Sequence, residues 1–151
     1  MISQTAEYAL RAVVALGSHR DGPLTTQQIA ARTRIPAGYL SKVLQALGRA
    51  GLVCGQRGLG GGFALARPQR EITVLDVINA VDPVQRIERC PLGRHEHAQQ
   101  LCALHRRLDL GISLMEQVYG RTTIEELLDG ADPARSLCAA TAEPGRERTE
   151  G

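Results

Sequence analysis

The sequence predicts a mainly α-helical protein with one small β-hairpin, and three observations support this prediction. Apolar residues recur every three or four positions through most of the chain, which is the period of an amphipathic helix. A glycine-rich segment at residues 58–62 interrupts this pattern between two short runs of strand-forming residues. The helical pattern returns after residue 100 as a single long apolar stripe.

The first third of the chain contains three predicted helices. The first covers residues 3–17 and ends before a turn. Thr25, with Gln28 three residues later, forms the capping box of a short second helix. Pro36 suits the first position of a third helix. The predicted inward residues of that third helix are Leu40, Val43, Leu44 and Leu47. Two short helices joined by a tight turn, after a longer helix, are the arrangement of a helix-turn-helix unit.

A β-hairpin is predicted directly after this unit. Residues 52–57 and 63–66 read as strands, and the glycines of residues 58–62 join them. A glycine-rich loop could also cradle a nucleotide phosphate, but the lysine of that motif is missing and a strand, rather than a helix, follows. A hairpin in this position is the wing of a winged helix. The sequence therefore predicts a winged helix-turn-helix domain over residues 1–82.

In the second half of the chain, the sequence predicts further helices before and after a polar segment. Thr73 caps a short helix, and the segment 83–104 after it holds cysteine and histidine residues. A long helix follows from about residue 101 to 119, and Thr123 begins a final short helix. The stripe of the long helix has nearly coiled-coil spacing and consists of Leu101, Leu104, Leu108, Ile112, Met115 and Tyr119.

Charge divides the chain into two unlike halves. Residues 1–70 hold nine Arg or Lys and two acids, a net charge of +7, whereas residues 71–151 hold nine Arg and fourteen acids, a net charge of −5. The basic half suits a polyanion, although an unevenly charged solvated surface would have the same composition. No apolar run is long enough for a bilayer and the start lacks the order of a secretion signal, so we expect a cytoplasmic protein without a membrane partner. Residues 130–151 are predicted to be a disordered tail.

The third helix supplies most of the predicted contacts to double-stranded DNA, because the second helix of a helix-turn-helix enters the major groove. Its outward residues are Gly38, Tyr39, Ser41, Lys42, Gln45 and Arg49. Gln45 can pair with adenine edges, whereas Lys42 and Arg49 suit phosphates.

Four further positions complete the predicted DNA-binding surface. Thr25 and Thr26, at a helix N-terminus, could contact a backbone phosphate. Arg57 is placed to reach the adjacent minor groove, and Gly60 permits close approach of the loop backbone. Winged helices also serve as protein-interaction modules, but the positive charge of this half favours DNA.

Several motifs follow one another in the order of a known family. They are Tyr8-Ala9-Leu10-Arg11, Ile35-Pro36-Ala37-Gly38-Tyr39-Leu40, Gly51-Leu52-Val53, Arg57-Gly58-Leu59-Gly60-Gly61-Gly62 and Ile72-Thr73-Val74-Leu75-Asp76-Val77-Ile78. With these motifs the chain resembles the Rrf-type transcriptional regulators, which include an iron–sulfur cluster regulator and a nitric-oxide sensor. The resemblance covers about residues 1–130, and the wing is its most specific part.

The resemblance implies a winged-helix homodimer that binds a palindromic operator. Residues 101–129 would be the dimerisation helix and a final short helix, with the long helix packed against its two-fold mate. Tyr39, Ser41 and Lys42 would lie in the major groove and Arg57 in the minor groove. Ser41 stands where the iron–sulfur regulator carries glutamate, so a shared operator sequence is not expected.

The resemblance also implies a sensor in the loop of residues 83–104, where many members hold an iron–sulfur cluster with three cysteines. Cys90, Cys102 and His105 match the outer cysteines and the histidine of one subgroup. The middle cysteine falls at Glu96 in an ungapped comparison, or at His97 in members with the pattern CxLGR, which residues 90–94 fit. Some relatives supply a carboxylate from the partner subunit, and Glu7 matches that position.

The chemistry of this donor set leaves several alternatives open. Cys90, His97, Cys102 and His105 offer two thiolates and two imidazoles, which suit a 2Fe-2S cluster or tetrahedral zinc. A chain that has lost its middle cysteine could also hold no metal, and Cys90 with Cys102 could sense oxidants as thiols. A Cys–His pair could serve an enzyme, but no substrate-binding region is recognisable. Cys54 and Cys138 have no ligand-spaced partner and are read as non-functional.

Overall fold

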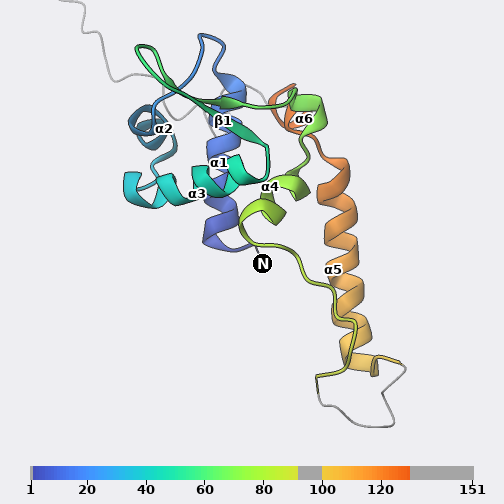
Figure 1. Cartoon of the computed structure of the whole chain (residues 1–151). Helices are drawn as coiled ribbons and strands as arrows, with labels where there is room; N and C mark the ends of the chain where they lie inside the picture. Colours follow the sequence, from blue (N-terminus) through green and yellow to red (C-terminus); the bar gives the residue numbers. More distant parts are fainter. Residues whose placement is uncertain (1, 92–99, 130–151) are drawn as a thin grey trace, which may run out of the picture.

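The computed structural model describes residues 2–91 and 100–129 and confirms a mainly helical fold with a two-stranded hairpin. Its elements are α1 (Gln4–Ser18), α2 (Thr26–Thr33), α3 (Ala37–Arg49), β1 (Val53–Gln56), β2 (Gly62–Leu65), the 3-10 turn η1 (Gln69–Glu71), α4 (Val74–Val81), α5 (Ala103–Arg121) and α6 (Ile124–Asp129). Helix α1 lies in the middle, with α2 and α3 on one side and α5 on the other (Figure 1).

Helix α1 is the element around which the other helices pack. Ser3 begins it by accepting a hydrogen bond from the backbone N–H of Ala6 at 3.2 Å. Ala6, Ala9 and Ala12 are fully buried along it, and their small side chains let neighbouring helices approach closely. Helices α2, α3, α4 and α6 all contact α1.

Helices α2 and α3 form the predicted helix-turn-helix. The capping box of Thr25 and Gln28 is present at the start of α2, and Arg34 ends this helix with a left-handed φ of +57°. Pro36 is the N-cap residue of α3 rather than its first helical residue, so the helix begins at Ala37. The predicted inward residues of α3 are all buried: Leu40, Val43, Leu44 and Leu47. Their burial holds α3 against the core, since each leucine side chain contributes about 1.5–3 kcal/mol.

The hairpin is tied to the loop between α1 and α2. Strands β1 and β2 are antiparallel, with Gln56 opposite Gly62. The N–H of Leu24 donates to the carbonyl of Phe63 at 2.9 Å, and the N–H of Phe63 donates back at 2.7 Å. This pair of hydrogen bonds extends the hairpin sideways and fixes its direction relative to the helix-turn-helix.

Gly62 marks the point where β2 passes closest to Leu24. Its φ is +151°, and a Cβ there would lie 2.4 Å from the Leu24 carbonyl oxygen. We expect Gly62→Ala to lower the free energy of unfolding by about 2 kcal/mol, because the two segments must separate. Gly55→Ala is the matched control, since its Cβ would meet the Phe63 ring at an ordinary 3.7 Å. Urea denaturation measures both, and an equal loss would contradict this prediction.

Helices α4 and α6 connect the second half of the chain to α1. Thr73 and Asp76 form a capping box at the start of α4, as the sequence predicts for Thr73. The N–H of Ile124 donates to the carbonyl of Ile72 at 2.9 Å, and the Ile124 side chain is fully buried. Among the described helices, none combines the length and apolarity that crossing a membrane requires.

The predicted stripe of α5 is partly buried along only part of its length. Ile112 and Met115 are partly buried and line a cavity of about 250 Å³ with Ile78 and Val84. Tyr119 packs against a small cluster around α4. Leu104 and Leu108, on the same side of the helix, are exposed, and Leu110, Leu114 and Val118 form a second exposed apolar row on another side. The part of the stripe that lies near α4 therefore belongs to the core of this chain, whereas the row of Leu110, Leu114 and Val118 lies open.

Candidate functional site

The exposed face of α3 brings together most of the predicted DNA-binding residues. The buried residues of α3 occupy one side of the helix, so Gly38, Lys42, Gln45 and Arg49 are exposed on the other. Ser41 is also exposed, and its hydroxyl donates to the carbonyl of Ala37 at 3.1 Å. Its oxygen therefore remains available as an acceptor, whereas its proton is used within the helix.

Tyr39 has a structural role that the sequence interpretation missed. Its ring meets the ring of Tyr8 edge-on, with centroids 5.4 Å apart and an interplanar angle of 82°. Its hydroxyl lies 2.5 Å from Oγ1 of Thr5, and 39% of the residue is exposed. Tyr39 thus attaches the start of α3 to α1, and its predicted major-groove contact remains a prediction.

The other predicted DNA-binding residues lie at the start of α2 and in the hairpin loop. Oγ1 of Thr25 accepts the N–H of Gln28 at 3.2 Å, so this hydroxyl is already used in capping. Thr26 begins α2, and Arg57 and Gly60 are exposed beside β1. The hairpin loop, α2 and α3 all lie on the side of the molecule opposite α5 (Figure 1).

The side chain of Glu7 forms an ion pair within α1. Its carboxylate accepts a hydrogen bond from Nε of Arg11 at 2.7 Å, and Arg11 also donates to the carbonyl of Thr33 at 3.2 Å. This pair connects α1 to the end of α2. Within one chain Glu7 is not part of the Cys/His group described next.

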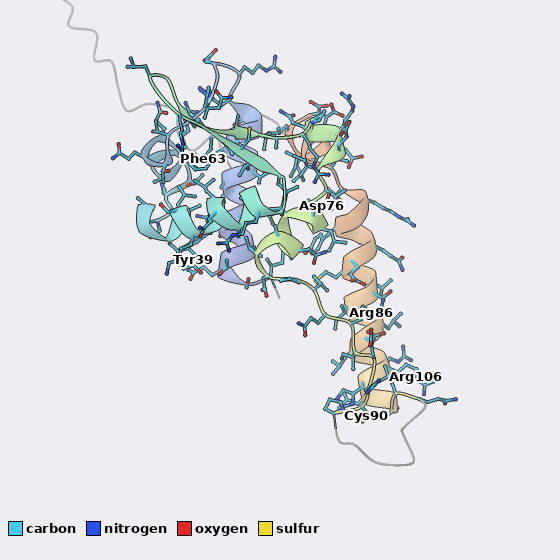
Figure 2. All side chains as sticks on the ribbon, in the orientation of Figure 1. Tyr39, Phe63, Asp76, Arg86, Cys90 and Arg106 are labelled. Atoms are coloured by element: carbon cyan, nitrogen blue, oxygen red, sulfur yellow. The ribbon has the colours of Figure 1, made fainter. Side chains whose placement is uncertain are left out.

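A group of metal-ligating side chains lies at the start of α5. The Sγ atoms of Cys90 and Cys102 lie 3.6 and 3.1 Å from Nδ1 of His105. All three ligand atoms lie within 4.8 Å of one another. Cys90 is buried, whereas Cys102 and His105 are partly exposed. Figure 2 shows Cys90 beside the end of α5 that lies far from the helix-turn-helix.

The position of Cys102 favours its thiolate. Cys102 is the N-cap residue of α5 and directly precedes the free backbone N–H groups of its first turn. The backbone N–H of His105, and next its imidazole, stabilise the negative sulfur and lower the pKa of Cys102 to about 7. Thiolate is the form that binds a metal, so this site is chemically prepared for one.

The structure describes three of the four predicted ligands and one of the two cysteines outside the ligand set. Cys90 and Cys102 come together as expected, but His97 lies outside the described residues, as does Cys138. Cys54 is exposed on β1, away from the Cys/His group.

An ion-pair network, which we call the Arg86 clamp, connects the segment before Cys90 to α5. Nε and Nη2 of Arg86 donate to the two carboxylate oxygens of Asp109 at 2.7 and 2.6 Å, and Nη1 reaches Glu116 at 3.3 Å. The N–H of Ile87 also donates to Asp109 at 2.9 Å. The hydrogen bonds from Arg86 and then Ile87 lower the pKa of Asp109 to about 2. The sequence gives no signal for this network, because its members are 23 and 30 residues apart.

We expect Arg86→Met to release the segment that carries Cys90, because Asp109 loses its bidentate partner. Alkylation of the buried Cys90 thiol, followed by mass spectrometry of metal-free protein, should become faster. Arg89→Met is the control, since Arg89 is exposed and has no ion pair with any residue that the structure describes.

The depressed pKa of Asp109 means that its stabilising effect is complete above its ordinary value of 3.8 and is lost as the pH falls towards 2. Wild-type protection of Cys90 that already disappears above pH 5 would contradict this account.

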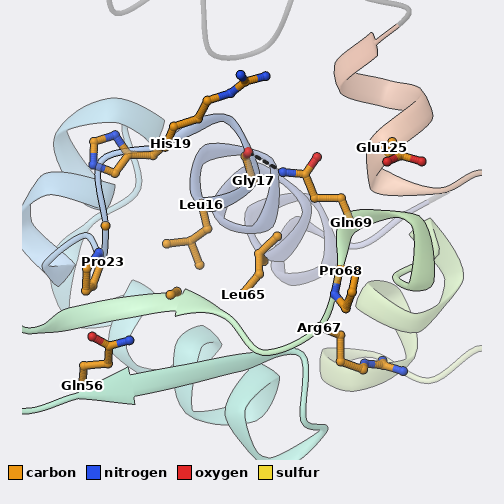
Figure 3. A pocket seen from close by; sticks show the side chains of 13 residues that line it. Leu16, Gly17, His19, Pro23, Gln56, Leu65, Arg67, Pro68, Gln69 and Glu125 are labelled. Atoms are coloured by element: carbon orange, nitrogen blue, oxygen red, sulfur yellow. Dashed lines mark hydrogen bonds between the residues drawn. The ribbon is translucent and has the colours of Figure 1, made fainter.

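A separate cavity of about 470 Å³ lies between the end of α1, the hairpin and α6 (Figure 3). Within it, Nε2 of Gln69 donates to the carbonyl of Gly17 at 2.6 Å. None of the residues that line it belongs to the predicted DNA-binding or metal-ligating sets.

The helix-turn-helix, the hairpin beside it and a Cys/His group on a long C-terminal helix define a winged-helix regulator of transcription. The model of the Rrf2 family, described as an iron-dependent transcriptional regulator, matches residues 2–130. The chain therefore belongs to the Rrf2 family of transcriptional regulators.

Curated relatives and solved structures agree with this assignment. The chain is 32% identical over 132 residues to an HTH-type transcriptional regulator of Aquifex aeolicus, covering 85% of this chain and 92% of that protein. It is 30% identical over 135 residues to the HTH-type transcriptional regulator IscR of Serratia proteamaculans, covering 87% and 80%. The structure of CymR, the global cysteine regulator of B. subtilis, is similar with a TM-score of 0.73 at 26% identity, covering 87% of this chain and 98% of CymR. T. potens IscR is similar with a TM-score of 0.73 at 26% identity, covering 89% and 90%.

Proposed function

We propose that this chain acts as a homodimer that binds a palindromic operator and senses iron–sulfur status, or redox or nitrosative stress, through a 2Fe-2S cluster. The observation that carries this proposal is the convergence of Cys90, Cys102 and His105 within 4.8 Å at the start of α5. The same helix presents an exposed apolar face suited to a second copy. The sensing group and the dimer contact would therefore share one rigid element.

Charge and exposure support the role of α3 in DNA binding. Lys42 and Arg49 would neutralise phosphates, and Gln45 between them would read a base edge. The net charge of +7 in residues 1–70 favours DNA over a protein partner. A two-fold axis would place two copies of this surface on successive half-sites, which explains the expectation of a palindrome.

The donor set of the Cys/His group fits an iron–sulfur cluster. Two thiolates and one imidazole are ligands that such clusters accept, and the lowered pKa of Cys102 favours the binding form. His97, or Glu7 of the partner subunit, would complete the set. When bound, a cluster with mixed ligation would supply a one-electron redox centre of raised potential. Zinc is the alternative metal for the same ligands.

The residues around the Cys/His group suggest how the signal reaches the DNA-binding surface. Cys90 lies on the segment held by the Arg86 clamp, whereas Cys102 and His105 lie on α5. A cluster or metal ion bound by these side chains would link the Cys90 segment to α5 at a second point, in addition to the Arg86 clamp. Helix α5 contacts α4, and α4 contacts both α1 and α3. A shift of α5 would therefore be transmitted to α3 through packed helices.

Anaerobic purification with analysis of iron, sulfide and visible absorption tests the proposed cluster. We expect wild-type protein to be coloured and to contain both elements, and Cys90→Ala to lose most of them because one of the converging ligands is removed. Cys54→Ala should retain the wild-type content, since Cys54 is an exposed cysteine outside the group. A colourless wild-type protein without iron or zinc would refute the metal centre.

The proximity of the two thiols to His105 favours one second candidate, a metal-free regulator that senses oxidants through Cys90 and Cys102. In that case metal-free wild-type protein would lose operator binding on oxidation, and the Cys90→Ala variant would not respond. The same Cys–His proximity would suit a nucleophilic enzyme, but the relatives are named as regulators of transcription, which supports binding rather than catalysis.

A further inference from the structure

The end of the hairpin carries a single side chain. Four of the residues in the segment 58–62 are glycines, so Leu59 is the only residue there with a Cβ. Leu59 is completely exposed, at 109% of its reference area. Scattered exposed leucines are ordinary on protein surfaces, and exposure alone would mean little. The construction of the loop around Leu59 is what distinguishes it.

The loop holds Leu59 at a defined position. The N–H of Gly61 donates to the carbonyl of Gly58 at 3.0 Å, and Gly60 has a φ of +74°. These are features of a type II β-turn, in which Leu59 occupies the first central position. A Cβ on Gly61 would lie 2.4 Å from the carbonyl oxygen of Gln56, so the chain is closely packed behind the turn. Leu59 therefore projects from a narrow tip whose backbone is held by a hydrogen-bonded turn.

The residues around this tip indicate what kind of partner Leu59 would contact. Arg57 is exposed directly before the turn, and an arginine favours the negative potential of a narrow minor groove. Glycines on either side of Leu59 leave the backbone thin enough to approach a groove about 6 Å wide. Leucine is one of the apolar residues that DNA-bending proteins insert between base steps from the minor groove.

On the basis of the proposed operator binding, we propose that Leu59 is an apolar wedge that enters the minor groove beside Arg57 and partly unstacks one base step. The operator is then bent at the position of each wing. Flexible pyrimidine–purine steps are favoured there, because their deformation costs least. Leu59 thus contributes sequence preference without a hydrogen bond to any base.

The test uses a duplex selected from random sequence by the wild-type homodimer, with 2-aminopurine placed at the step that faces the wing. We expect wild-type binding to raise the 2-aminopurine fluorescence and Leu59→Asn, a polar side chain of similar size, to abolish this rise at saturation. The affinity of Leu59→Asn should fall about tenfold, with an unchanged dependence on salt because no charge is removed. Leu59→Met keeps an apolar side chain and should retain both affinity and fluorescence.

Thermal unfolding of the variants should be unchanged, since Leu59 makes no buried contact. If Leu59→Asn matches the wild type in affinity and fluorescence, the wedge is refuted while operator binding stands. If the wild-type chain selects no duplex at all, the proposed function fails and this inference fails with it.

Discussion

Replacing Leu114 with aspartate should convert the proposed homodimer into a monomer. Leu114 is 53% exposed in the middle of the apolar face of α5, and a carboxylate there would have to be buried without a partner. Operator affinity should fall by about 100-fold or more, because each monomer would hold only one half-site. Sedimentation analysis measures the oligomeric state, and fluorescence anisotropy measures the affinity.

Leu127→Asp provides the matched control for this prediction. Leu127 is 40% exposed but lies on α6 rather than α5, so the added charge should leave the dimer intact. A Leu114→Asp protein that remains dimeric and binds operator normally would show that the exposed face of α5 is not the dimer contact.

Arg57→Ala should weaken specific operator binding by about tenfold or more, whereas non-specific binding should change much less. The reason is that Arg57, exposed directly before the glycine turn, is predicted to enter the narrow minor groove. Titrations of a selected duplex and of a scrambled duplex at two salt concentrations separate the two effects.

Arg70→Ala removes the same charge from a different position. Arg70 lies on η1, outside the predicted DNA-binding set, and lies 3.9 Å from Glu71. Its loss should reduce affinity for both duplexes slightly and equally. Unchanged specific binding by the Arg57→Ala variant would exclude the minor-groove role of Arg57.

Much of the DNA-binding half could be predicted because its signals are local. The capping box at Thr25 and the helix cap at Thr73 depend only on residues close in the chain, and both are present in the structure. The buried face of α3 follows from helical periodicity alone. Tyr39 is exposed as expected, but the sequence does not reveal that its hydroxyl meets Thr5, 34 residues earlier in the chain. Periodicity shows which side of a helix is polar, but not which neighbour a residue at the edge of that side will contact.

The ligands of the candidate metal centre could be predicted from the sequence, but the contacts that position Cys90 could not. Cys102 and His105 are one helical turn apart, so their proximity follows from the helix. Cys90 comes from a different segment, and the Arg86 clamp that holds this segment to α5 has no pattern in the sequence. Ion pairs between distant segments depend on how those segments pack, which no short spacing reveals.

The sequence by itself determined which helices form and where the wing lies, with ends correct to about two residues, because caps, glycines and apolar periods act over a few residues. It also indicated a basic half suited to DNA and a set of Cys and His donors. Only the tertiary structure decided that Cys90 lies against His105, and that α5 partly buries Ile112, Met115 and Tyr119 but leaves Leu110, Leu114 and Val118 exposed. These features depend on contacts between segments far apart in the chain, and packing of the whole domain selects them.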